Sequence, residues 1–551
     1  MELRPASKST FQNLWRPHAR HWRQLLPRII IAIAIYMVLD KTLILIADTS
    51  AGGYHQPFVP GEILKNVFTR FYLVLLALLI IPFILRKLLL PWSAFEKGKA
   101  IRILLFSAAL MLSWKYVTAD YNYYLDNWYL PDRILLIILT FLILSRPFFL
   151  LPFLVALLTI IGQYQLLPVY SLAAESLLFR SQILFMSFFI IRVFTNYFSY
   201  EEFIFLIGCL LGAHYFESGI LKINPEWLLY DNIPYLLPNI YTSGWLSHLS
   251  PEDISYITRS AGWVNVPIKL YTITIECGML LIFLNLRFTR FLLAGAIIFH
   301  LGIFLMTGIF FWMWILFLFV ILVYVFNRKD ARIRLLFSRS YLLLSLPLIA
   351  LGEFWCDPVG LAWHDSTMNY TYKFQAEMDN GTRQLLPPEF FSPYYYQFTL
   401  GNFKYLSPDK LLPVVWGATN ATTSRGLRNS PTISGALAYE QKAGRRFQDP
   451  DKKIYFEGFV QQFVGNWNSK RDKHHYINYL QPPRLLLNFP TKSIVPADNK
   501  IVTIRVLEIT SYYSHAEGYK VIRSRNIGQI AIPPLNAASE QVQNIKSDRG
   551  F

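Results

Sequence analysis

Residues 201–222 read EEFIFLIGCLLGAHYFESGILK, an apolar run that is long enough to cross a membrane. At about 1.5 Å per residue, a helix of this length spans about 30 Å of hydrocarbon. The run nevertheless carries His214, Glu217 and Lys222. Ionisable side chains are costly inside a membrane, and where they occur they mark functional sites. This stretch therefore predicts a membrane protein and also indicates where its site lies.

The composition of the whole chain agrees with a membrane protein. Of its 551 residues, 54% are hydrophobic and 16% are aromatic, which is unusual for a soluble globular protein. A net charge of +17 would also suit a nucleic-acid-binding protein. The basic residues, however, gather in short segments between apolar runs, which is how membrane topology is encoded. We therefore expect membrane lipid as a partner and no nucleic acid. The three cysteines are scattered, and no spacing in the chain predicts a metal site.

Apolar windows along the chain predict an all-α polytopic membrane bundle of about eleven transmembrane helices. The windows are 28–48, 69–91, 101–118, 132–145, 147–166, 176–197, 201–222, 267–286, 289–307, 309–326 and 336–355. The segment before them, 1–27, is basic and is expected in the cytoplasm. An odd number of spans then places the end of the chain on the opposite, periplasmic or lumenal side.

The sequence divides into three predicted parts at these boundaries. Residues 1–27 form the cytoplasmic segment, 28–355 the helical bundle, and 356–551 an extracytoplasmic domain. In the last part, residues 453–463 and 500–510 alternate or are rich in β-branched residues, which is typical of strands. We therefore expect the extramembrane C-terminal domain to be β-rich.

The ionisable residues of the quoted run do not share one face of a helix. At 100° per residue, His214 and Lys222 lie on one face, whereas Glu217 lies about 140° away from Lys222. Glu217 and Lys222 are therefore not a simple intrahelical ion pair. Gly208 and Gly212 form a small-residue spacing that lets a neighbouring helix approach closely. The polar face is expected to point toward a cavity or the outer surface, where Lys222 could instead extend to the head groups.

Two later spans carry ionisable residues of their own. Glu276 lies in TITIECGMLL and His300 in AIIFHLGIFLMTGIFFW. A single intramembrane histidine is usually a packing residue. Together with the quoted run, however, the chain places ionisable residues in three successive spans, which favours a shared site within the bundle.

Two segments resemble one membrane family. Residues 215–227, YFESGILKINPEW, are similar to a segment of the vitamin K-dependent γ-glutamyl carboxylases and of the wider horizontally transferred transmembrane domain (HTTM) family. Residues 299–312, FHLGIFLMTGIFFW, resemble the histidine-bearing helix of the same family. The matched positions are Tyr215, Phe216, Gly219, Lys222, Asn224, Glu226, Trp227, His300, Gly308 and Phe311. The order of a cytoplasmic N-terminus, a helical bundle and an outer β-rich domain is also similar.

The resemblance implies an enzyme, a lyase, that uses reduced vitamin K or a related quinol. Lys222 would be the base that deprotonates the quinol. Oxygen would then form an epoxide, and the strong base released would remove a γ-proton from a glutamate of a peptide or protein, which captures CO2. A lysine in a water-poor pocket gives up its proton more easily than one in water, which suits this role. His300 would line the quinol pocket, and His214 and Glu217 would tune the lysine or relay protons.

The match to the family is incomplete. Glu276 and Asn122 are further candidates for the quinol pocket, and Asn122 only partly matches an Asn-His pair of the carboxylases because Tyr123 follows it. Leu221 stands where the carboxylases have a second lysine. A shared scaffold with another substrate therefore stays open, since fold does not fix function.

Two other classes of function are compatible with the same residues. One is a transporter or immunity-type membrane protein that uses the HTTM scaffold without carboxylation, with the charged residues along a pathway. The other is a membrane acyltransferase with His300 as its base, which would leave Lys222 without a role.

Overall fold

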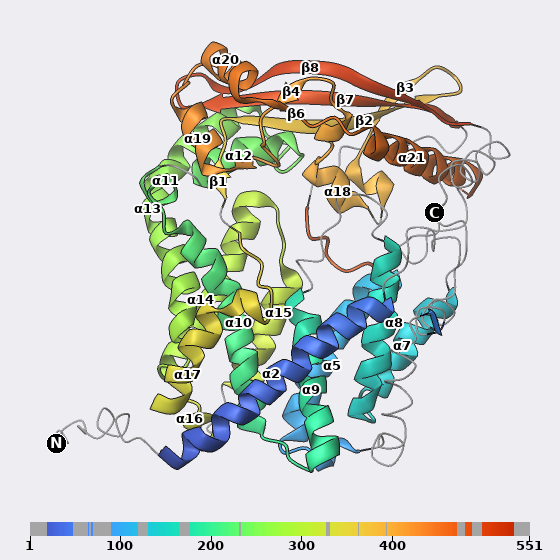
Figure 1. The fold of residues 1–551 in the computed structure, drawn as a ribbon. Helices are drawn as coiled ribbons and strands as arrows, with labels where there is room; N and C mark the ends of the chain where they lie inside the picture. Colours follow the sequence, from blue (N-terminus) through green and yellow to red (C-terminus); the bar gives the residue numbers. More distant parts are fainter. Residues whose placement is uncertain are drawn as a thin grey trace, which may run out of the picture.

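The computed structural model has a bundle of helices, with a β-sheet and several helices across one end of it (Figure 1). The structure describes residues 19–47, 64, 68–69, 90–118, 130–164, 176–230, 233–326, 331–361, 363–392, 394–470, 480–487 and 499–533. Five helices among these residues are long and apolar enough to cross a membrane, as expected of a membrane protein. They are α5 (Gly98–Thr118), α9 (Ser176–Thr195), α10 (Tyr200–Lys222), α13 with its 3-10 turn η5 (Pro251–Leu281) and α14 (Leu286–Thr307).

Further helices complete the bundle and the segments that join it to the sheet. They are α2 (Ala19–Ala47), α7 (Leu130–Leu142), α8 (Leu150–Tyr164), α11 (Pro225–Leu229), α12 (Ile233–Thr242), α15 (Trp312–Val320), α16 (Ala331–Leu335) and α17 (Arg339–Ala350). The predicted span 69–91 lies almost entirely outside the described residues. The number of eleven spans therefore stays a prediction.

Helix α10 lies inside the bundle and packs against α9, α13 and α17. The side chain of Ser199 caps its first turn by accepting a hydrogen bond from the backbone N–H of Glu202. Two glycines permit the close packing. A Cβ atom on Gly212 would lie 2.8 Å from Ile349, and one on Gly219 would lie 2.8 Å from Cys277 Sγ. The predicted close approach of a neighbouring helix is therefore confirmed.

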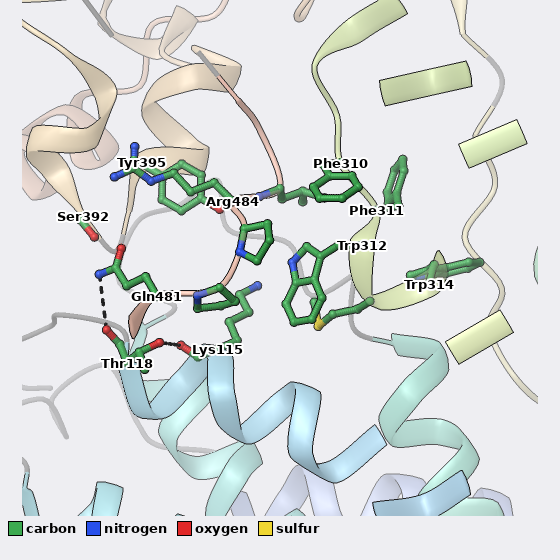
Figure 2. Close-up of a pocket in the computed structure, with 14 residues that line it drawn as sticks. Lys115, Thr118, Phe310, Phe311, Trp312, Trp314, Ser392, Tyr395, Gln481 and Arg484 are labelled. Atoms are coloured by element: carbon green, nitrogen blue, oxygen red, sulfur yellow. Dashed lines mark hydrogen bonds between the residues drawn. The ribbon is translucent and has the colours of Figure 1, made fainter. Parts of the chain in front are cut away.

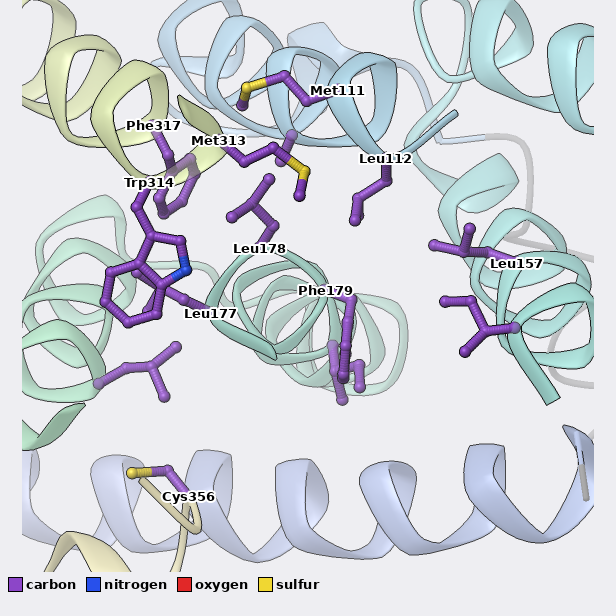
Figure 3. Packing of buried hydrophobic residues seen from close by; sticks show 14 of the residues in the cluster. Met111, Leu112, Leu157, Leu177, Leu178, Phe179, Met313, Trp314, Phe317 and Cys356 are labelled. Carbon is purple, nitrogen blue, oxygen red and sulfur yellow. The ribbon is translucent and has the colours of Figure 1, made fainter. Parts of the chain in front are cut away.

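The interior of the bundle is packed with aliphatic, aromatic and sulfur-containing side chains. Figure 3 shows Met111 and Leu112 of α5 facing Leu178 of α9 and Met313 of α15 across this core. All four are buried. Because such surfaces give no hydrogen bonds, polar groups within the bundle must find partners of their own.

The C-terminal part contains a four-stranded antiparallel sheet and several helices. The sheet order is β3 (Arg383–Leu386), β2 (Met368–Met378), β7 (Ile501–Ser514), β8 (Gly518–Ala531). Two short strand pairs join β1 (His364–Asp365) to β5 (Ala418–Thr419) and β4 (Lys410–Leu411) to β6 (Arg445–Arg446). The helices are α18 (Tyr395–Leu400), α19 (Ala421–Arg428), α20 (Ile433–Ala443) and α21 (Pro450–Lys470). The strand predicted at 500–510 is confirmed as part of β7.

The strand predicted at 453–463 is wrong, because these residues lie within α21. The buried side chains recur at helical spacing: they are Phe456, Phe459, Val460, Phe463 and Val464. Aromatic rings of the sheet and its neighbouring turns pack against this stripe, as Phe374 does against Phe456 at 5.9 Å between ring centroids. The C-terminal region therefore contains a sheet, as expected, but combines it with helices.

Residues 480–487, called the strap below, connect the two parts. Leu486 pairs with Ile309 as an antiparallel bridge just after α14. The backbone N–H of Phe310 donates to the carbonyl oxygen of Leu485 at 2.7 Å. The indole N–H of Trp114, on α5, donates to the carbonyl oxygen of Leu480 at 2.6 Å. The strap therefore contacts two elements at the end of the bundle that faces the C-terminal sheet.

Candidate functional site

A buried ion pair joins α10 to α13. Lys222, the last residue of α10, donates from Nζ to both carboxylate oxygens of Glu276 at 2.8 and 2.7 Å. It also donates to the carbonyl oxygen of Ser218 at 3.1 Å. The side chains of Lys222 and Glu276 are only 10% and 4% exposed. The pair forms because Gly219 lets the backbone of α13 approach α10 one turn before the lysine.

The burial of this pair has an energetic consequence. A buried charge without its partner lowers the free energy of unfolding by several kcal/mol. Replacing both charged residues with an apolar pair of similar volume would change it little or not at all. Stability alone therefore does not explain why the bundle holds a lysine and a glutamate here. An ionisable pair between two helices that are long and apolar enough to cross a membrane is a candidate functional site.

A second polar contact lies along the same face of α10. The hydroxyl of Tyr215 is 2.6 Å from Nε2 of His300, on α14. Tyr215 precedes Lys222 by seven residues, so both lie on one face, about 10 Å apart along the helix axis. The two pairs therefore form one line of polar groups.

Aromatic rings surround the histidine end of this line. The ring of Trp314 lies 5.6 Å from that of His300 and 6.0 Å from that of His214, between centroids. Phe311 lies 5.1 Å from His300. His214 donates from Nδ1 to the carbonyl oxygen of Leu210 at 2.8 Å. Within the described part of the chain, Nδ1 of His300 and Nε2 of His214 have no hydrogen-bond partner.

The structure brings together only some of the predicted site residues. Lys222 and Glu276 are in contact, and His300 and His214 both lie beside Trp314. Glu217 points elsewhere: its Cγ lies 3.6 Å from where a Cβ on Gly360 would be, in the segment after the last helix of the bundle. Asn122 lies outside the described residues.

Sequence reasoning missed two members of this cluster. Tyr215 was named only as a match to the family, although its spacing of seven from Lys222 places it on the lysine's face. No sequence spacing indicates Trp314, because its contacts with the histidines depend on how α15 packs against α14.

An ionic network joins the segment after Lys222 to the C-terminal part of the chain. Arg428 of α19 lies 3.5 Å from a carboxylate oxygen of Glu226 and 3.7 Å from one of Asp365. The hydroxyl of Ser424 donates to Asp365 at 3.4 Å. Burial raises the pKa of Asp365 from 3.8 to about 6, and the nearby Arg428 guanidinium offsets only part of this effect. The loop after Lys222, which contains Glu226, is therefore linked through Arg428 to the ionisable carboxyl group of Asp365.

A cavity lies where the helical bundle meets the C-terminal part of the chain (Figure 2). It has a volume of about 70 Å³ and is bordered by the end of α5, the start of α15, the strap and residues around Tyr395. Phe311 and Trp314 line it and also contact His300. The cavity and the histidine cluster are therefore adjacent. Nothing in the sequence analysis predicted this cavity, since its walls come from four distant segments.

No family model, curated protein or solved structure matches the chain. The carboxylase-like family and its chemistry therefore stay predictions from the residues named above.

Proposed function

We propose that this chain is an integral membrane enzyme of the carboxylase-like type, with Lys222 as a base that acts on a lipophilic reduced quinone. The observation that carries the proposal is the buried, bidentate contact between Lys222 and Glu276. Five helices long and apolar enough to cross a membrane support its place in the bilayer. We further propose that the N-terminus is cytoplasmic and the sheet domain periplasmic or lumenal.

The residues around His300 fit an aromatic quinol. Phe311 and Trp314 offer flat apolar surfaces of the kind on which a ring packs. Nδ1 of His300, which has no hydrogen-bond partner among the described residues, offers a hydrogen-bonding group for a ring oxygen. The quinol, when bound, would supply an acidic hydroxyl and two electrons for the reduction of oxygen.

Within the ion pair, a proton can move before Lys222 acts. The two contacts of 2.7 and 2.8 Å allow one ammonium proton to pass to the carboxylate of Glu276. The amine is then neutral and can accept a proton from the substrate. Afterwards it is an ammonium again, beside the substrate anion, and it stabilises that charge in a water-poor site. Glu276 therefore has the role of making the lysine a base.

The contact between Tyr215 and His300 provides a second place where a proton can move. Tyr215 can donate its hydroxyl proton to Nε2 of His300. The outer domain is proposed to present a peptide or protein to this site, because the cavity at its base adjoins the histidine cluster.

Two variants separate this proposal from the acyltransferase alternative. Purified protein in lipid is incubated with reduced vitamin K and oxygen, and the epoxide is measured by mass spectrometry. Lys222→Ala and Glu276→Gln should each lower epoxide formation by about 100-fold or more, the usual contribution of a general base. An acyltransferase would form no epoxide and would transfer acyl groups without Lys222, so retention of acyl transfer by Lys222→Ala would reject the proposal.

A further inference from the structure

The strap lies against residues 308–310, called the track below, in the way that a bound extended peptide would. The backbone N–H of Phe310 donates to the carbonyl oxygen of Leu485 at 2.7 Å. In return, the backbone N–H of Leu487 donates to the carbonyl oxygen of Gly308 at 3.0 Å. Two such bonds around an antiparallel bridge are the pattern by which a protein adds an extended peptide to a backbone edge. The track therefore recognises an extended main chain.

The glycine of the track is needed for this close approach of two backbones. Gly308 has a φ of +72°, in the left-handed region that favours glycine. A Cβ atom there would lie 2.8 Å from the ring of Trp245 and 3.0 Å from the carbonyl oxygen of Leu487. A side chain at this position would therefore push a second main chain away from the track.

Two side chains of the strap show which peptide the track favours. Leu486 is 2% exposed and belongs to an apolar cluster that includes Trp416. The guanidinium of Arg484 lies 3.1 Å from Glu389 and over the ring of Tyr395 at 5.5 Å. A peptide bound in the same way would therefore carry a basic residue two positions before a large apolar one.

The strap has few contacts of the kind that would hold it permanently. Leu486 is its one buried residue. Pro482 and Pro483 have no backbone N–H to donate, and both line the cavity that also borders Phe311 and Trp314. A segment with so little buried apolar surface opens at a low free-energy cost. Removal of the strap would open the cavity beside the histidine cluster.

We propose that the strap occupies the place of a peptide ligand and leaves when that ligand binds. The ligand is an extended peptide with a basic residue two positions before a large apolar one. While the strap is in place, it closes the cavity beside the histidine cluster. The inference rests on the proposed function only where it makes the peptide a substrate, because the binding itself involves no quinol.

The test measures binding of a peptide with the sequence of residues 481–487, QPPRLLL, to the full chain in detergent. The peptide carries fluorescein, and its anisotropy is followed. Leu486→Ala should bind it at least about tenfold more tightly than the native chain, because the strap loses its one buried side chain while the track is unchanged. The matched control is Leu480→Ala, at a strap position that is 64% exposed, which should bind like the native chain. A strap that only holds the fold together predicts no gain in binding.

Two altered peptides test how the track recognises its ligand. N-methyl groups at the positions of Leu485 and Leu487 remove both backbone donors, which bond to the Tyr395 hydroxyl and to the carbonyl oxygen of Gly308. This peptide should bind at least about tenfold more weakly, although it is no less apolar. Glutamate in place of the arginine should also weaken binding at least about tenfold, because it places two carboxylates together at Glu389.

A disulfide that locks the strap gives a second, independent measurement. Ile309 and Leu486 face each other across the bridge, so Ile309→Cys/Leu486→Cys can form a disulfide. The reduced form should bind the peptide and the oxidised form should not, although both carry the same substitutions. Unfolding temperatures without peptide identify any variant that fails to fold.

Three results would overturn the proposal. They are no tighter binding by Leu486→Ala, equal binding by the oxidised and reduced double-cysteine forms, and equal binding of the N-methylated peptide. The assay contains no quinol and no oxygen chemistry. Its failure is therefore distinguishable from a failure of the epoxide measurement, which tests the proposed function.

Discussion

Replacing Glu276 with leucine should cost more stability than replacing both members of its ion pair. In the single variant, Lys222 keeps a side chain that is only 10% exposed and loses both of its contacts with the carboxylate. An uncompensated charge of this kind costs about 3–5 kcal/mol. In the double variant Lys222→Met/Glu276→Leu, two apolar side chains of similar size replace the pair. We expect the free energy of unfolding of the double variant to lie within about 1 kcal/mol of native, or above it.

Three native cysteines make this measurable in lipid or detergent. Cys209 and Cys356 are buried, so a thiol-reactive dye reports their exposure on unfolding. The matched control is Lys99→Met, at an exposed position of α5, which should shift stability by no more than about 0.5 kcal/mol. Two results would refute this expectation. One is a native free energy of unfolding for Glu276→Leu. The other is a double variant that loses as much stability as Lys222→Met and Glu276→Leu added together.

Three further perturbations test the surroundings of the site. Gly219→Ala should cost about 1–3 kcal/mol, because its Cβ would lie 2.8 Å from Cys277, whereas Gly262→Ala, with open space around it, should be neutral or stabilising in the same unfolding assay. Tyr215→Phe should cost about 1–3 kcal/mol, since it leaves a buried ring nitrogen of its histidine partner without a contact; an unchanged unfolding temperature would contradict this. Asp365 has a folded-state pKa of about 6, above its value of 3.8 in the unfolded chain. The protonated carboxyl therefore contributes to the free energy of unfolding fully below pH 3.8, and this contribution is lost as pH rises through 6. The free energy of unfolding of the native protein should therefore fall by about 2 kcal/mol between pH 4 and 7 relative to Asp365→Asn, and identical pH profiles would refute the assignment.

The five apolar helices overlap predicted windows because the signal for such a helix is local. A run of about 20 apolar residues encodes a membrane helix without reference to the rest of the chain. The quoted segment, 201–222, forms α10 almost residue for residue. Its glycines also pack as their spacing indicated, since the spacing of small residues on one helix face is itself a local property.

The outer domain was less predictable, and α21 shows why. Its sequence KIYFEGFVQQF has apolar residues at positions that fit both a strand and a helix over a short window. The period becomes clear only over the full helix, where Phe456, Phe463 and their neighbours face one core. By contrast, the β-branched run in β7 favours a strand in almost any context.

Some members of the candidate site were predicted from the sequence, but their pairing was not. Lys222, Glu276 and His300 were identified because each is costly where it stands. Which side chain meets which depends on how α10, α13 and α14 pack, so the contact of Lys222 with Glu276 could not be read from the chain. The cavity near Lys115 has no signal at all in one sequence, because its walls meet only in the folded protein.

The central claim is that Lys222 and Glu276 act together as a base on a reduced quinone, and one comparison tests it directly. Epoxide formation from reduced vitamin K under oxygen is measured by mass spectrometry for native protein and for Lys222→Met/Glu276→Leu, at equal measured stability. We expect epoxide from the native protein and at least about 100-fold less from the double variant. Epoxide at the native rate from the double variant, or none from the native protein, would contradict it.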